Sequence, residues 1–208
     1  MPNSPSSRRG PGRPPDPDKR SERRKTILTQ AVTHFARDGF ARTDVAAVAE
    51  AAGCSKGTVY NYFENKQALF RDAVDHVMDG LVKATSDPED EGSVEGFGRA
   101  IEAFLRYFDE NPAYIELLIQ ERAVFKDRAK PTYLEYCDTH RDEHKGFFEK
   151  LSAEGVFRQL SADRLFDIIS DLLYGTIFTN YFAKRKTCLE QQASDITDLL
   201  LNGLLARP

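Results

Sequence analysis

The chain has 208 residues, of which 40% are hydrophobic and 30% charged, and its formal net charge is −4. Its length allows one large or two small globular domains, and no apolar run approaches the roughly 20 residues that a membrane span needs. Three scattered cysteines are too few for a disulfide framework. The N-terminus opens with Pro, Ser and Arg in place of an apolar stretch, so we expect no secretory signal. These observations exclude a membrane protein and a disulfide-stapled secreted domain, and they predict a cytoplasmic globular protein.

The charges are unevenly distributed along the chain. Residues 1–25 hold eight basic and three acidic residues, whereas residues 81–208 hold 16 basic and 23 acidic residues. A basic front end on an acidic body favours contact with a polyanion, although an ordinary solvated tail has the same composition. Residues 1–17 contain six prolines and two glycines and cannot bury a core, so we expect a disordered basic arm over residues 1–20.

Residues 21–81 have the pattern of four helices joined by short turns. Apolar residues recur at helical spacing from Ser21, and Gly39 is expected to end this first helix. Polar residues are expected to cap the three helices that follow: Thr43, Ser55 and Asn65. Between the second helix, 44–52, and the third, Gly53 is expected to supply the positive φ of a tight turn.

The helical pattern continues over residues 82–208, after an acidic, Pro- and Gly-marked break at residues 86–96. Apolar periodicity and start signals predict helices that begin near Phe97, Pro112 and Pro131, and two more at about 162–184 and 190–206. No segment has the alternation typical of a strand. We therefore predict an all-α fold.

Two short helices around a glycine turn, at about residues 44–63, meet the requirements of a helix-turn-helix. In that unit the first helix braces against a duplex, and the second enters the major groove with its N-terminal end. Small side chains allow the two helices to approach closely: Ala46, Ala47, Ala49, Ala51 and Ala52. Cys54 follows the turn, where a small apolar residue would fill the junction, so we expect it to pack rather than react.

The run from Thr43 to Phe70, with Ser55-Lys56-Gly57-Thr58-Val59-Tyr60-Asn61-Tyr62-Phe63 at its centre, resembles the TetR family of bacterial transcriptional regulators. The preceding Ala31, Phe35 and Gly39-Phe40 resemble the first helix of that family and its exit. The resemblance covers about residues 21–81, and Cys54 departs from it where the family more often has valine. It implies an N-terminal three-helix DNA-binding domain at 21–81 and a C-terminal helical effector-binding and dimerisation domain at 82–208.

The resemblance also implies roles for individual residues of the helix-turn-helix. Four residues would face the groove: Lys56, Gly57, Thr58 and Asn61. Five would bind phosphates: Thr43, Ser55, Tyr60, Tyr62 and Lys66. The Thr58 methyl group can meet a thymine methyl, and the Asn61 amide can form two hydrogen bonds to adenine. Val59, Phe63, Leu69 and Phe70 are expected in the core.

The basic arm carries a Gly-Arg-Pro core at residues 12–14, flanked by further arginines. This run resembles the AT-hook pattern, in which an extended segment places arginine in a narrow A/T minor groove. Arg13 is therefore a candidate minor-groove contact. A disordered basic tail without groove reading is the alternative.

A single short recognition helix reads too few base pairs for specificity, so we expect a homodimer on double-stranded DNA with a pseudo-palindromic operator. The last two helices, about 162–184 and 190–206, carry apolar faces long enough for half of a four-helix interface. The resemblance implies the same helices. Alternatively, these faces only close the core of the monomer.

The middle of the chain is rich in aromatic residues, and the resemblance implies a pocket there for a small-molecule effector, with an apolar or aromatic ligand. The candidate effector residues are Phe104, Phe108, Tyr133, Tyr136, Cys137, His140, Tyr174 and Phe178. A filled core is the alternative. Cys137, His140 and His144 share one helix face and have the residue types for a soft metal, a polar patch or a cavity wall. We predict no metal and no cofactor.

The function implied is a homodimeric repressor that a small effector releases from its operator, with repression taken from the tendency of the family. The sequence holds no Gly-rich phosphate loop after a strand and no nucleophile elbow, so we do not expect an enzyme. An architectural DNA-binding protein with weak sequence preference and no effector is a further alternative.

Overall fold

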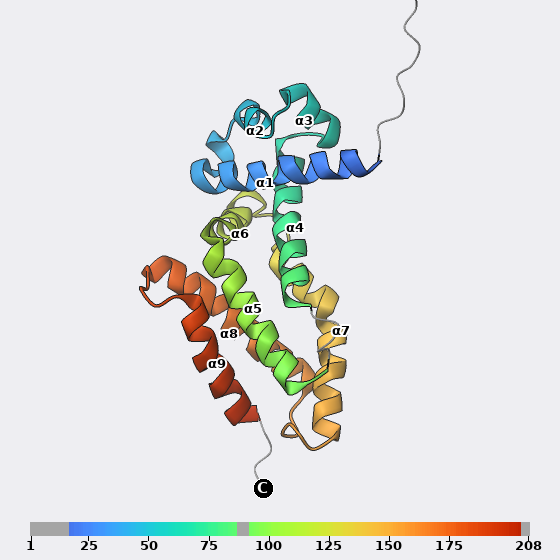
Figure 1. Cartoon of the computed structure of the whole chain (residues 1–208), viewed down its shortest axis with the longest axis vertical. Coiled ribbons are helices and arrows are strands. Elements are labelled where there is room, and N and C mark those ends of the chain that lie inside the picture. The colour runs from blue at the N-terminus through green and yellow to red at the C-terminus, as the bar shows by residue number, and fades with distance from the viewer. Residues whose placement is uncertain (1–16, 87–91, 205–208) are drawn as a thin grey trace, which may run out of the picture.

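The computed structural model describes residues 17–86 and 92–204. Over these ranges the chain forms nine α-helices and no strand, so the prediction of an all-α fold is confirmed (Figure 1). The helices are α1 (Pro17–Arg42), α2 (Val45–Ala51), α3 (Lys56–Tyr62), α4 (Lys66–Thr85), α5 (Val94–Glu110), α6 (Pro112–Val124), α7 (Thr132–Ala153), α8 (Ala162–Ala183) and α9 (Leu189–Leu204). Among these described helices, none is both long and apolar enough to cross a bilayer.

The molecule has a head and a body (Figure 1). The head consists of α1 with α2 and α3 on its far side, and α4 runs from the head into the body. There α4 packs on α5, which also contacts α8 and α9, while α7 packs on α8. The first helix reaches the body through α6, which lies directly beneath it. A motion of the body can therefore reach the head through two helices that contact α1, namely α4 and α6.

The core of the head follows from helical spacing in α1. Ile27, Ala31 and Phe35 lie four residues apart and are all fully buried. Phe35 meets Phe70 of α4 edge to face, with ring centroids 4.9 Å apart. The predicted core residue Val59 is likewise fully buried. The short helices of the head are thus held by tertiary packing, because seven residues form no stable helix alone.

The ends of α1 differ from the prediction in detail. The helix begins at Pro17, so residues 17–20 are helical although we expected them in the disordered arm; residues 1–16 lie outside the described residues. Proline suits a first helical position because its missing N–H would be unpaired there anyway. Gly39 breaks the helical backbone as predicted, with φ 79° and ψ 156°, although the range of α1 continues to Arg42.

Two of the three predicted caps are confirmed. Ser55 accepts a hydrogen bond from the N–H of Thr58 at 3.1 Å, and Asn65 accepts one from Ala68 at 2.9 Å. The prediction for α2 is wrong by one residue, because Asp44 accepts from the Ala46 N–H at 2.8 Å and is the N-cap.

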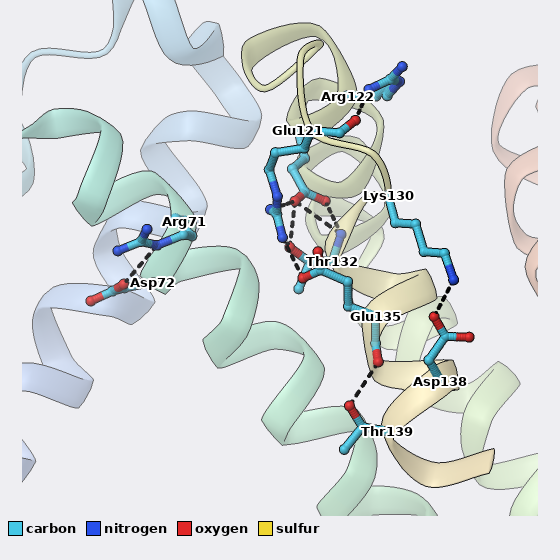
Figure 2. A network of polar contacts seen from close by, with 10 residues as sticks. Arg71, Asp72, Glu121, Arg122, Lys130, Thr132, Glu135, Asp138 and Thr139 are labelled. Carbon is cyan, nitrogen blue, oxygen red and sulfur yellow. Dashed lines mark hydrogen bonds and ion pairs between the residues drawn. The ribbon is translucent and has the colours of Figure 1, made fainter.

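In the body, α7 has no capping side chain of its own, and a buried carboxylate from α6 takes that place (Figure 2). Glu121 is 1% exposed and accepts hydrogen bonds from the Thr132 N–H at 3.0 Å and from Arg128 Nη1 at 2.7 Å. The hydroxyl of Thr132 donates to the same carboxylate. Both oxygens of the buried group thus have donors, which offsets the cost of removing the charge from water.

Candidate nucleic-acid interface and effector region

The turn between α2 and α3 has the geometry that a helix-turn-helix needs. Gly53 has φ +65°, a conformation in which any other residue is strained, and its N–H donates to Glu50 O at 3.0 Å. The N–H of Cys54 donates to Ala49 O at 2.9 Å, and its half-buried side chain packs against the core of the head as predicted. The turn therefore fixes the angle between the two helices.

The third helix buries one face and presents the other to solvent. Val59 and Phe63, four residues apart, are buried against the head. The residues between and before them point outward: Ser55, Lys56, Gly57, Tyr60 and Asn61 are exposed, and Thr58 and Tyr62 are partly exposed. The structure thus leaves seven of the predicted DNA contacts at least partly exposed along α3, although Tyr60 and Tyr62, two residues apart, point in different directions.

Two of the predicted phosphate contacts also form hydrogen bonds within the protein. Thr43 is 3% exposed, and its hydroxyl donates to Gly39 O at 2.8 Å, where the chain bends after α1. The ammonium group of Lys66 donates to Ala41 O at 3.1 Å and lies 5.0 Å from the centroid of the Phe40 ring. The remaining predicted contact, Arg13, lies outside the described residues.

Arginines of α1 form contacts with the helix-turn-helix that sequence reasoning missed. Arg23 Nη1 donates to Ala52 O at 3.1 Å and to Gly53 O at 3.4 Å, across the turn. Arg24 forms an ion pair of 2.8 Å with Asp72 of α4. Both arginines fall within the helix predicted from Ser21, but their partners lie 29 and 48 residues away along the chain, and the local sequence carries no signal for them.

Six of the eight candidate effector residues lie together between α5, α7 and α8. The Tyr174 ring is 5.2 Å from Phe104 and 4.6 Å from Tyr133, measured between centroids, and Tyr133 is 5.8 Å from Phe178. Phe104 also contacts Phe108, with ring centroids 5.2 Å apart. Burial raises the pKa of the Cys137 thiol and that of the Tyr174 hydroxyl. Rings at these distances are in contact, so these side chains form one packed aromatic cluster.

The other two candidates, Tyr136 and His140, face α4 instead. Tyr136 donates to Asp79 Oδ1 at 2.6 Å, and the His140 ring stacks on Tyr136 with centroids 6.1 Å apart. Beside them, burial together with the charges of Asp72 and Asp79 raises the pKa of Asp75 to about 6.

The candidate metal ligands Cys137, His140 and His144 do not converge. Cys137 faces the aromatic cluster, His140 bonds the Tyr136 carbonyl oxygen at 2.9 Å, and His144 stacks on Phe166 at 5.6 Å. In the part of the chain that the structure describes, no group of three such side chains is placed to hold a metal ion.

The comparisons with known proteins agree with this geometry. The family model for bacterial regulatory proteins, tetR family, matches residues 27–73, which hold α2, α3 and most of α1. The HTH-type transcriptional repressor SCO4008 of Streptomyces coelicolor is 33% identical over 118 residues, 57% of this chain and 56% of that protein. This chain spans between 37% and 65% of the length of the first three curated relatives that it matches.

Solved structures extend the similarity over the body. The TetR-family regulator PfmR of Thermus thermophilus has a TM-score of 0.67 and 25% identity, covering 87% of this chain and 99% of that one. FadR of Bacillus subtilis, solved with stearoyl-CoA, has a TM-score of 0.71 over 86% of this chain and 97% of its own, and at 17% identity it shares the fold. Over residues 27–73 the chain thus matches the tetR family of bacterial regulatory proteins, and over most of its length it is similar to regulators of that family.

Proposed function

We propose that the chain is a sequence-specific DNA-binding transcriptional regulator that acts in the cytoplasm as a homodimeric repressor. The observation that carries this proposal is the outward face of α3, where Lys56, Gly57, Thr58 and Asn61 lie opposite the buried side chains of Val59 and Phe63. Small and hydrogen-bonding groups on a helix held by a rigid turn suit the major groove. The repressor SCO4008 among its relatives supports repression.

Homodimer formation is supported by an unpartnered face of α8. Ile168, Gly175 and Phe182 lie seven residues apart and so share one side of this helix. Ile168 is 48% exposed and Phe182 is 67% exposed, and on α9 Leu199 is 71% exposed. Large apolar side chains at such exposure are unusual in a monomer unless another surface covers them. We propose that α8 and α9 pack on the same helices of a second copy.

Release by a small apolar or aromatic effector is supported by the aromatic cluster between α5, α7 and α8. Because its rings are in contact, a ligand must part them and so must favour a second conformation of the body. The stearoyl-CoA bound to FadR is an example of a ligand with a long apolar chain in the same fold. Since α5 packs on α4, which carries the head, this second conformation would alter the spacing of the two heads.

Selection of binding sites from random DNA by the purified protein, at two salt concentrations, tests the proposal. We expect a pseudo-palindromic consensus with half-sites about one helical turn apart, ~34–36 Å. The selected DNA would then serve as a probe for effectors by their ability to release it. Enrichment of no sequence, with retention that falls steeply with salt, would instead support an architectural DNA-binding protein.

A further inference from the structure

The first turns of α1 carry three arginines close to the helix-turn-helix. Two of them form hydrogen bonds or ion pairs with other residues of the protein. Arg23 bonds the carbonyl oxygens of the α2–α3 turn, and Arg24 pairs with Asp72 while its guanidinium lies 5.4 Å from the Phe63 ring centroid. These contacts attach the start of α1 to the turn and to α4. The position of the third arginine relative to α3 is therefore fixed.

The third arginine, Arg20, has a different environment. Its guanidinium lies 5.6 Å from the centroid of the Tyr62 ring, and the residue is exposed. A guanidinium above an aromatic ring uses its face, so its N–H groups remain available at the edge. Among the described residues, no carboxylate or carbonyl oxygen accepts a hydrogen bond from Arg20. The group thus offers a planar fork of donors to solvent.

Tyr62 is the last residue of α3, at the opposite end from the residues that enter the groove first. A group at that end lies toward the rim of the groove, where the phosphates run. A guanidinium fork matches two oxygens of a phosphate, and the Tyr62 hydroxyl adds a donor beside it. We propose that Arg20 and Tyr62 together bind one phosphate of the DNA backbone, outside the groove that α3 reads.

This inference rests on the proposed function, and the test uses the full chain with an operator obtained by selection. Binding is measured over a series of salt concentrations for the wild type, Arg20→Ala and Lys25→Ala. We expect Arg20→Ala to lower the slope of log affinity against log salt by about 1.8 on the operator, about 0.9 for each of the two phosphate contacts that the dimer loses. It should weaken binding to operator and to random DNA alike, by about threefold to fivefold.

Lys25→Ala is the matched control, because it removes one positive charge from the same helix about 140° around its axis. We expect it to leave the slope unchanged. An equal loss of slope in both variants would mean a general electrostatic effect and would overturn the proposed site. An unchanged slope in Arg20→Ala would overturn it as well.

A neutral methylphosphonate placed at each operator phosphate in turn locates the contact. The wild type should lose affinity at one flanking phosphate in each half-site, and Arg20→Ala should be insensitive at that position only. Arg20→Lys should retain the salt slope but bind more weakly, because lysine lacks the fork. Tyr62→Leu should reduce the effect of Arg20→Ala, since the ring that holds the guanidinium is gone.

The two proposals fail in different ways. A wild-type protein that selects no sequence contradicts the proposed function. If the wild type binds its operator but Arg20→Ala loses affinity at the same methylphosphonate positions as the wild type, only the Arg20–Tyr62 site is contradicted.

Discussion

Asn61 is the exposed α3 side chain best suited to read a base, because its amide offers a donor and an acceptor side by side. We expect Asn61→Ala to relax the preference at one base position of each half-site, at a cost of about 1–3 kcal/mol, and to leave binding to random DNA unchanged. Affinities for the operator and for its single-base variants measure this change.

Lys66→Ala provides the contrast for Asn61→Ala. Removal of a charge at the start of α4 is expected to weaken binding to all sequences and to flatten the salt dependence. Because the Lys66 ammonium also bonds Ala41 O, the unfolding temperature of this variant must be compared with that of the wild type. Equal effects of the two variants on specific and random DNA would contradict the assigned roles.

At the scale of single residues, the sequence predicted which residues lie at the helix ends better than it predicted the groups to which they form hydrogen bonds. Thr43 and Asp44 are neighbours in the sequence, and both residue types are suitable N-caps for α2. The bend at Gly39 exposes carbonyl oxygens that the Thr43 hydroxyl satisfies, so the cap falls to Asp44. Lys66 is diverted by the same segment, through Ala41 O. The Thr43 acceptor lies only four residues upstream and depends on the bend at Gly39, whereas the Lys66 acceptor lies 25 residues away and has no local signal.

At the element scale, α4 joins the head to the body and contains a notch at Gly80. A Cβ at this position would lie 2.4 Å from the Tyr107 hydroxyl of α5, which donates to Val77 O at 2.7 Å. We expect Gly80→Ala to lower the free energy of unfolding by about 1–2 kcal/mol, because loss of this fit outweighs the gain in helix propensity, about 1 kcal/mol. Chemical denaturation measures the difference.

Tyr107→Phe supplies the control for this notch. Without the hydroxyl the nearest remaining atom is ring carbon Cζ, 3.3 Å from the added Cβ, which needs only a small shift. In the Tyr107→Phe background, Gly80→Ala should therefore be neutral or stabilising. A Gly80→Ala effect of the same size in both backgrounds would show that the notch does not hold Tyr107.

Helix periodicity explains why the elements were predictable and their connections were not. The apolar residues of α1, α5 and α8 recur every three or four positions, and this pattern is local. By contrast, the Tyr107–Val77 bond joins residues 30 positions apart, and Glu121 caps α7 from 11 positions upstream. Such contacts depend on which helices meet, and a single sequence carries no signal for them.

At the scale of the whole molecule, the sequence predicted where aromatic side chains gather but not that they touch. Whether rings fill a space or line a cavity depends on differences of about 1 Å in the separation of the helices, and amino-acid composition does not determine that separation. The same limit applies to the faces of α8 and α9. Their apolar stripes were visible, and only the packing shows that Ile168, Phe182 and Leu199 are left uncovered.

Gly175 allows a direct test of the dimer proposed from these faces. A Cβ there would meet nothing within 4 Å, so Gly175→Leu should leave the monomer folded and even favour α8. If two copies approach closely at this glycine, the added side chain should raise the dimer dissociation constant at least about tenfold. Sedimentation measures the shift toward the mass of one chain, 23.5 kDa.

Gly146→Leu is the matched control, because Gly146 of α7 also has nothing within 4 Å of an added Cβ and lies outside the proposed interface. Both variants gain the same side chain on an exposed helix, so a difference between them reports the partner surface alone. If Gly175→Leu remains as dimeric as Gly146→Leu, the two copies do not meet at this glycine. Loss of dimer in Gly175→Leu should also reduce operator affinity to that of one half-site, because each head then binds alone.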